Sequence, residues 1–144
     1  MISKVLVDTG PLVAILDTDD SRHTLCVTTL SIIRPPLFTC WPVLTEAAYL
    51  LRSQPKLVQS LILSLESGFL QLKHLEHSDC QGMANILSRY ADQAFQLADV
   101  AIMHLAEREG METVFTLDRR DFLVYRRKNG RILNIVPEVD CAIS

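Results

Sequence analysis

The sequence predicts an α/β domain built around a mostly parallel central sheet that is covered by helices on both faces. Short apolar runs alternate along the chain with longer segments of helical periodicity. The first run, residues 5–7, is apolar throughout, as expected of a strand buried on both sides. The chain has 144 residues, of which 49% are hydrophobic and 22% charged, and this suits one compact domain. We therefore expect a three-layer sandwich formed by a single domain, residues 1–144.

Five short apolar runs are expected to form the strands. The first ends at Asp8, the second is closed by Pro42, the fourth ends at Asp118 and the last is stopped by Pro137. The expected strands are residues 5–7, 37–41, 69–75, 113–117 and 132–136.

Helices are expected between these strands. Pro11 suits the first turn of a helix because its missing N–H has no partner there. Leu57, Leu61 and Leu65 share one face of another predicted helix. The stretch 18–34 has a weaker pattern, and we interpret it as helical from about Ser21. The remaining helices are expected at about 43–52, 56–67, 78–90 and 97–109.

Composition excludes several classes of protein. With 14 basic and 17 acidic residues the formal net charge is −3, so a nucleic-acid role would need a local basic patch or metal ions. The four cysteines show no CxxC spacing, which argues against a zinc knuckle and a disulfide framework. No apolar run reaches the ~18 residues of a membrane span, and the start lacks a signal-peptide pattern. We expect a cytoplasmic protein that does not enter a membrane.

Four carboxylates stand beside strongly apolar sequence: Asp8, Glu46, Asp99 and Asp118. A charge in such surroundings is costly unless it is paired or binds a cation. Asp8 and Asp118 also follow predicted strands, and parallel sheets bind ligands at the carboxyl ends of their strands. Each acid taken alone could be a turn residue, a helix cap or a partner of the helix dipole. Together they predict a site for a divalent metal ion.

Such a site suits phosphodiester hydrolysis. Mg²⁺ takes oxygen ligands, usually a few carboxylates with water and substrate phosphates. One ion can activate a water molecule, and a second can stabilise the leaving oxygen. Clustered carboxylates repel one another, so the metal-free protein should be the less stable form.

The order of these four acids resembles the acidic signature of PIN-domain nucleases, and more narrowly that of VapC-type toxin ribonucleases. Consecutive acids are separated by 38, 53 and 19 positions. The resemblance covers nearly the whole chain. The matching blocks are residues 7–14, 41–47, 97–101 and 115–122.

The resemblance implies Mg²⁺ or Mn²⁺ as cofactor, with Asp8 and Asp99 as the main metal ligands. Glu46 and Asp118 would complete the cluster, directly or through water. Many relatives carry a further acid three positions before the residue that matches Asp99, and here that position is the neutral Gln96. Asp92 and Asp121 look like solvated or capping residues. By the same resemblance, two hydroxyl neighbours are candidates for orienting a metal-bound water: Thr9 and Thr116.

A basic segment follows Asp118. Six of the 14 basic residues lie within 13 positions there, opposed only by Asp121. Such a patch can bind the phosphate backbone of RNA, although it could also be a solvated loop or contact an acidic antitoxin. The candidate RNA-binding residues are Arg119, Arg120, Arg126, Arg127, Lys128 and Arg131.

These observations predict a metal-dependent endoribonuclease, the toxin of a type II toxin–antitoxin pair. RNA would be the substrate, an antitoxin the partner, and a homodimer the expected assembly. One alternative is a non-catalytic PIN-like interaction module. Another is a phosphatase, because the segment 7–10 is similar to the start of haloacid-dehalogenase phosphatases; those enzymes need a second aspartate where this chain has Gly10.

Overall fold

The computed structural model describes residues 1–138 and contains one five-stranded sheet. Every neighbouring pair of strands is parallel, in the order β3-β2-β1-β4-β5. Each strand lies within one of the five runs predicted from the sequence, so the predicted α/β class is confirmed. The strands are β1 (Val5–Val7), β2 (Leu37–Thr39), β3 (Leu70–Leu72), β4 (Thr113–Phe115) and β5 (Asn134–Val136).

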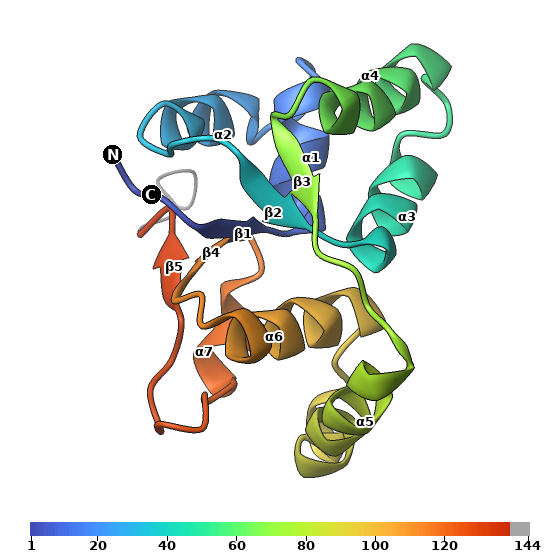
Figure 1. Ribbon diagram of the computed structural model, residues 1–144. Coiled ribbons are helices and arrows are strands. Elements are labelled where there is room, and N and C mark those ends of the chain that lie inside the picture. Colours follow the sequence, from blue (N-terminus) through green and yellow to red (C-terminus); the bar gives the residue numbers. More distant parts are fainter. Residues whose placement is uncertain (139–144) are drawn as a thin grey trace.

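Helices cover both faces of this sheet. The first face carries α1 (Thr9–Leu16), α2 (His23–Leu30), α3 (Trp41–Leu50) and α4 (Pro55–Glu66). The second carries α5 (Cys80–Arg89), α6 (Leu97–Glu109) and α7 (Arg119–Val124), as Figure 1 shows. Two short 3₁₀ turns, η1 (His77–Asp79) and η2 (Ala91–Gln93), flank α5. Within residues 1–138, no helix combines the length and apolar character needed to cross a membrane.

The start of α3 and the presence of α7 differ from the prediction. Trp41 was expected to end a strand but begins α3, because Pro42 occupies one of the first two helical positions, where its missing N–H costs nothing. The helix α7 was not predicted. It has only six residues, and its start depends on the Asp118 side chain, which accepts a hydrogen bond from the backbone N–H of Asp121.

The chain begins at the centre of the sheet and adds its later strands first on one side of β1 and then on the other. From β1 it proceeds outward to β2 and β3, while β4 and β5 lie on the other side of β1. Because right-handed crossovers in opposite directions place their helices on opposite faces, a crevice forms between the carboxyl ends of β1 and β4. Val7 pairs with Phe115, so Asp8 and Thr116 follow side by side at this crevice.

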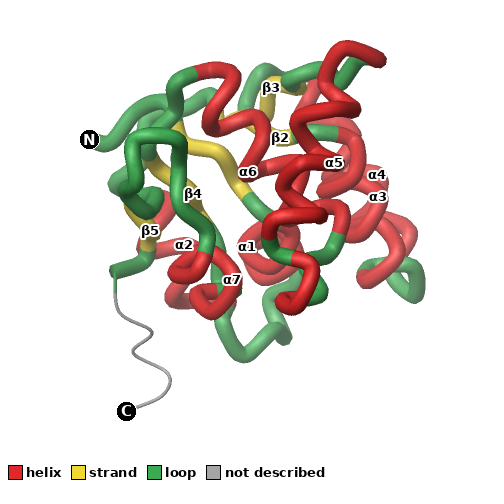
Figure 2. The backbone as a smooth tube through the Cα atoms, turned by 90° about the horizontal axis from the view of Figure 1, so that it is seen from below, coloured by secondary structure: helices red, strands yellow, loops and turns green. Residues whose placement is uncertain are grey.

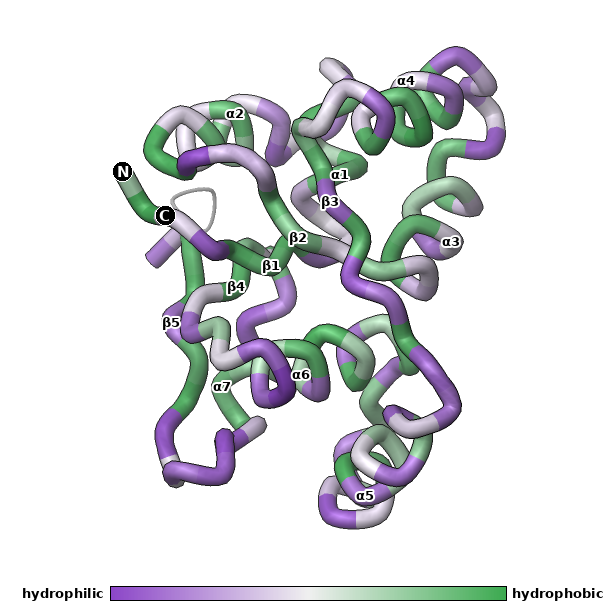
Figure 3. The backbone as a smooth tube through the Cα atoms, in the orientation of Figure 1, coloured by the Kyte–Doolittle hydropathy of each residue, from purple (hydrophilic) through white to green (hydrophobic). Residues whose placement is uncertain are grey.

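The core lies between the sheet and both helical layers. The three residues of β1 are fully buried, and α6 buries eight of its residues, Asp99 among them. Figure 2 shows α5 beside α6, away from β4 and β5. Hydrophobic residues lie along the strands, while the loop after α7 is hydrophilic (Figure 3).

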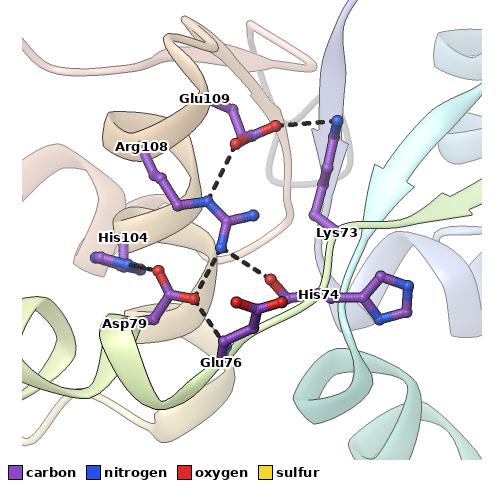
Figure 4. A network of polar contacts seen from close by, with 7 residues as sticks. All are labelled: Lys73, His74, Glu76, Asp79, His104, Arg108 and Glu109. Atoms are coloured by element: carbon purple, nitrogen blue, oxygen red, sulfur yellow. Dashed lines mark hydrogen bonds and ion pairs between the residues drawn. The ribbon is translucent and has the colours of Figure 1, made fainter.

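A polar network holds η1 and α5 against α6 (Figure 4). Asp79, only 5% exposed, accepts a hydrogen bond from the backbone N–H of Glu76 and meets His104 and Arg108, each at 2.8 Å. Gly82 fits this contact because an added Cβ would lie 2.4 Å from His104 Cε1. The network thereby fixes α5 on the helix that carries Asp99.

We predict that the contribution of Asp79 to stability depends on pH. The backbone N–H of Glu76, followed by His104 and Arg108, lowers the pKa of Asp79 to about 2. A carboxyl with a depressed pKa in the folded state stabilises it above its unfolded pKa, and this stabilisation is lost as pH falls. Asp79→Asn should therefore lower the urea midpoint at pH 6, and the gap from the parent protein should close between about pH 4 and pH 2. Asp19→Asn, at an exposed site, is the control. A gap that stays constant with pH would contradict the assignment.

Candidate metal centre

Five carboxylates from four parts of the chain line one cleft of about 490 Å³ at the carboxyl ends of β1 and β4. Asp8 follows β1 and precedes α1, while Asp118 follows β4 and precedes α7. Glu46 comes from α3, Asp99 from the first turn of α6, and Asp121 from α7. The topology thus collects acids that are far apart in the sequence.

Asp8 is fixed on both oxygens by protein donors. The backbone N–H of Thr9 donates to Oδ1 at 2.8 Å, and the Thr116 hydroxyl donates to Oδ2 at 2.7 Å. The backbone N–H of Asp118 in turn donates to Thr116 Oγ1 at 2.9 Å. Asp8 is 4% exposed and Thr116 is fully buried. This chain of hydrogen bonds ties the ends of β1 and β4 together and sets the position of the Asp8 carboxylate.

Asp99 is surrounded differently. It is 7% exposed and follows Ala98 on a helix whose neighbouring residues are buried and apolar. Two other acids lie close to it, since one carboxylate oxygen each of Asp99, Asp118 and Asp121 lie within 4.8 Å of one another. Asp99 and Asp121 are buried and Asp118 is half-buried, so the group is costly when all three are charged.

The pKa values of these groups reflect this cost. Burial, followed by the charges of Asp8 and Asp118, raises the pKa of Asp99 to about 9. Burial also raises the pKa of Asp8 to about 6, against the opposing hydrogen bonds from Thr116 and Thr9. The pKa of Asp121 is raised as well, first by burial and then by the charge of Asp118. The cluster therefore retains protons near neutral pH unless a cation replaces them.

The donor set suits a hard divalent cation. The carboxylates of the cleft offer only oxygen atoms, the ligands preferred by Mg²⁺ and Mn²⁺, and neither histidine nor cysteine is among the lining residues. Asp99, Asp118 and Asp121 could each contribute one oxygen to a common ion. Asp8 retains free lone pairs on oxygens that accept one hydrogen bond each.

Comparison with known proteins places the chain in a family. Residues 5–128 match the PIN domain. The chain belongs to the PIN domain family. The ribonuclease VapC26 of Mycobacterium tuberculosis is 27% identical over 135 residues, which cover 92% of this chain and all of that protein.

A solved structure shares the fold of this PIN domain. The crystal structure of Mycobacterium tuberculosis VapC20, described as a Sarcin-Ricin loop cleaving toxin, superposes with a TM-score of 0.74 at 18% identity. The match covers 81% of this chain and 92% of that one. The likeness confirms the three-layer arrangement with a parallel central sheet.

All four acids singled out in the sequence, Asp8, Glu46, Asp99 and Asp118, line the same cleft of the PIN domain. Glu46, which is half-buried, and Asp8, which is buried, both stand outside the group of three closely spaced acids. Their roles as metal ligands stay predictions.

Asp121 was expected to be a solvated or capping residue, and the structure contradicts the first of these alternatives. This carboxylate is 8% exposed and lies against Asp99 and Asp118. The available signal was its spacing, because residues three apart on a helix share a face, and Asp121 lies three positions after Asp118. Gln96 lines the cleft at an exposed position.

The two threonine hydroxyls both have protein acceptors. Thr116 donates to Asp8, and Thr9 Oγ1 lies 3.5 Å from the carbonyl oxygen of Val43. These contacts connect α1 with α3 and β1 with β4. The orientation of a metal-bound water by either threonine stays a prediction.

The basic segment does not line one surface of the PIN domain. Arg120 lines the acidic cleft, and Arg119 donates to the carbonyl oxygen of Pro137 at 3.0 Å. Arg126 and Lys128 line a cavity beside α5. Arg127 and Arg131 line a further hollow near β5. The segment is divided because α7 carries its first part to the cleft and the following loop carries the rest away.

We predict that charge repulsion in the cluster lowers the stability of the metal-free protein as pH rises. The pKa of Asp99 is about 4 in the unfolded chain and about 9 in the folded protein. Between these pH values folding takes up a proton, so the free energy of unfolding falls as pH rises. Asp99→Asn should raise Tm at pH 8 by about 3 °C or more. At pH 4 the difference should disappear. The measurement is thermal unfolding in EDTA across pH 4–9.

Added Mg²⁺ or Mn²⁺ should raise the Tm of the parent protein at pH 8 and leave that of Asp99→Asn nearly unchanged. If the Tm of the parent protein and the Tm of Asp99→Asn depended equally on pH in EDTA, this result would contradict the predicted charge repulsion.

Proposed function

We propose that this PIN domain is a metal-dependent endoribonuclease, the toxin of a type II toxin–antitoxin pair, which hydrolyses RNA phosphodiester bonds. The proposal rests on one observation above all: buried carboxylates from separate segments meet at the carboxyl ends of β1 and β4. The relatives support it, because one is named a ribonuclease and the other a toxin that cleaves the Sarcin-Ricin loop. We assign the activity to one domain that spans residues 1–144.

Asp8, Asp99, Asp118 and Asp121 would hold a divalent ion, Mg²⁺ or Mn²⁺, with Glu46 at the edge of the site. When bound, such an ion supplies an activated water and neutralises charge on the phosphate. The residues of the chain prepare the site. Thr116 holds Asp8 in place, and the first turn of α6 presents Asp99.

Arg120 is placed to bind the substrate. Its side chain is 76% exposed, lines the acidic cleft and lies 3.6 Å from Asp121. An arginine here can bind a phosphate oxygen of RNA beside the carboxylates and offset their repulsion of the backbone. We assign the remaining basic residues of the segment to RNA farther from the cut.

The same proposal also predicts the binding partners of this PIN domain. Exposed apolar side chains on α3 and α4 offer a surface for a homodimer or an antitoxin, and they include Trp41, Tyr49 and Leu63. We place the protein in the cytoplasm, where its RNA substrate is found. A non-catalytic module would not need buried acids held together, and a phosphatase of the haloacid-dehalogenase type would need an acid at Gly10.

We predict that three carboxylates are needed for cleavage to different degrees. Asp8→Asn and Asp99→Asn should abolish Mg²⁺-dependent cleavage of RNA, because each removes a charge that holds the ion. Asp121→Asn should reduce the rate by about 10–100-fold, as expected of a supporting group. The assay follows a fluorescent RNA on denaturing gels, with circular dichroism to verify folding.

Asp92→Asn is the matched control, since Asp92 is exposed in η2 and should leave the rate unchanged. Full cleavage by folded Asp8→Asn and Asp99→Asn variants would overturn the proposed site. Cleavage that persists in EDTA would overturn the metal dependence.

A further inference from the structure

A second cavity of about 490 Å³ lies between α5, α6 and the segment that follows α7. Its walls include the apolar parts of Ile86, Tyr90 and Tyr125. It is separate from the acidic cleft, with which it shares no lining residue.

The wall of this cavity is aromatic and held in place. The Tyr90 ring lies 5.3 Å from the ring of Phe95 and 5.8 Å from that of Tyr125, measured between centroids. The Tyr90 hydroxyl accepts a hydrogen bond from the backbone N–H of Arg126 at 3.0 Å. Tyr90 remains partly exposed. A flat group entering the cavity would therefore meet an ordered aromatic surface.

The rim is basic although the whole chain is acidic. Four basic residues line the cavity against one acid, Glu107. Arg108 is engaged by Asp79 and Glu109. Arg89 and Lys128 are exposed, and within residues 1–138 neither side chain forms an ion pair. Lys128 is thus available to an anion, and so is Arg89, whose guanidinium lies over the Tyr90 ring, 5.6 Å from its centroid.

The cavity and the acidic cleft flank the same short stretch of chain. Tyr90 lines the cavity, while Ala94 and Gln96 line the cleft. The start of α7 and the segment after it both contact this stretch: Arg120 Nη2 donates to the carbonyl oxygen of Gln93 at 3.4 Å, and the backbone N–H of Arg126 donates to the Tyr90 hydroxyl. One extended polyanion could therefore occupy both sites by passing over this stretch.

We propose that the cavity is an RNA subsite that receives a nucleotide away from the scissile bond. Its base would lie against Tyr90 and Ile86, and the adjoining phosphates would contact Arg89 and Lys128. Aromatic surfaces combined with cations bind single-stranded nucleic acid in this way. This inference rests on the proposed function. Continuity with the cleft favours RNA over an acidic peptide, because an RNA strand bound in the cavity can extend to the carboxylates that would cleave it, whereas an acidic peptide is not a substrate for them.

The test is the affinity of a 5′-fluorescein, 20-nucleotide, mixed-sequence single-stranded RNA, measured by fluorescence anisotropy in EDTA so that no cleavage occurs. The charge variant is Arg89→Ala with Lys128→Ala. Its control is Arg34→Ala with Lys56→Ala, which removes the same charge from exposed positions before β2 and at the start of α4.

A second pair of variants tests the cavity itself without changing charge. Asn85→Trp places a bulky side chain at an exposed residue of the lining, and Ala84→Trp places it at an exposed neighbour outside the lining. Both positions lie on α5, so the pair separates blockage of the cavity from general effects on the helix.

The proposal predicts that the charge variant weakens RNA binding about 10-fold and makes the slope of log K against log salt shallower by about 1.4, the value for two phosphate contacts on a single strand. Asn85→Trp should weaken binding as well. Both control variants should bind within about 2-fold of the parent, at a conserved slope.

RNA affinity unchanged by the charge variant and by Asn85→Trp would overturn the assignment and leave the cavity to another ligand. Equal losses in test and control variants would also overturn it, because the effect would then be general electrostatics. The proposed function is judged separately by cleavage with Mg²⁺. A parent protein that cleaves while its cavity variants bind normally contradicts only the subsite, whereas cavity-dependent binding without cleavage contradicts only the nuclease.

Discussion

Repulsion among carboxylates that the fold forces together is the constraint on which the rest of this structure depends. The register of β1 with β4 places Asp8 beside Thr116, and α6 brings Asp99 to the same crevice. Two buried acids and one half-buried acid, with oxygens within 4.8 Å of one another, must share protons or bind a cation. A cation removes the repulsion and leaves every carboxylate charged. In the proposed function, relief of this repulsion would be the source of the affinity of the cluster for metal.

The surrounding elements keep this cluster from relaxing apart. Asp79, His104 and Arg108 fasten η1 and α5 to α6, and α6 presents Asp99. The Asp118 side chain starts α7, whose first turn supplies Asp121. The basic cavity is built on neighbouring parts of the chain, since α6 and the segment that follows α7 form part of its wall. The candidate metal site and the candidate RNA subsite are therefore connected through α6.

Much of the fold could be predicted from local sequence, because buried parallel strands are continuous apolar runs and their ends carry polar residues. Asp8 and Asp118 could be found for the same reason, and Glu46 and Asp99 could be found because they interrupt strongly apolar sequence. The features that the sequence analysis missed depend on tertiary contacts. The short helix α7 has little periodicity of its own, and Asp121 looks like an ordinary cap until α6 brings Asp99 against it. The basic segment looked like one patch because its division between cleft and cavity follows from the position of α7.

Anomalous X-ray diffraction from crystals soaked in Mn²⁺ tests the central claim most directly. We predict an anomalous peak in the cleft, within coordination distance, about 2.2 Å, of carboxylate oxygens from Asp8, Asp99 and at least one of Asp118 and Asp121. A cleft without a peak at a saturating Mn²⁺ concentration, or a peak that leaves both Asp8 and Asp99 without metal, would contradict it.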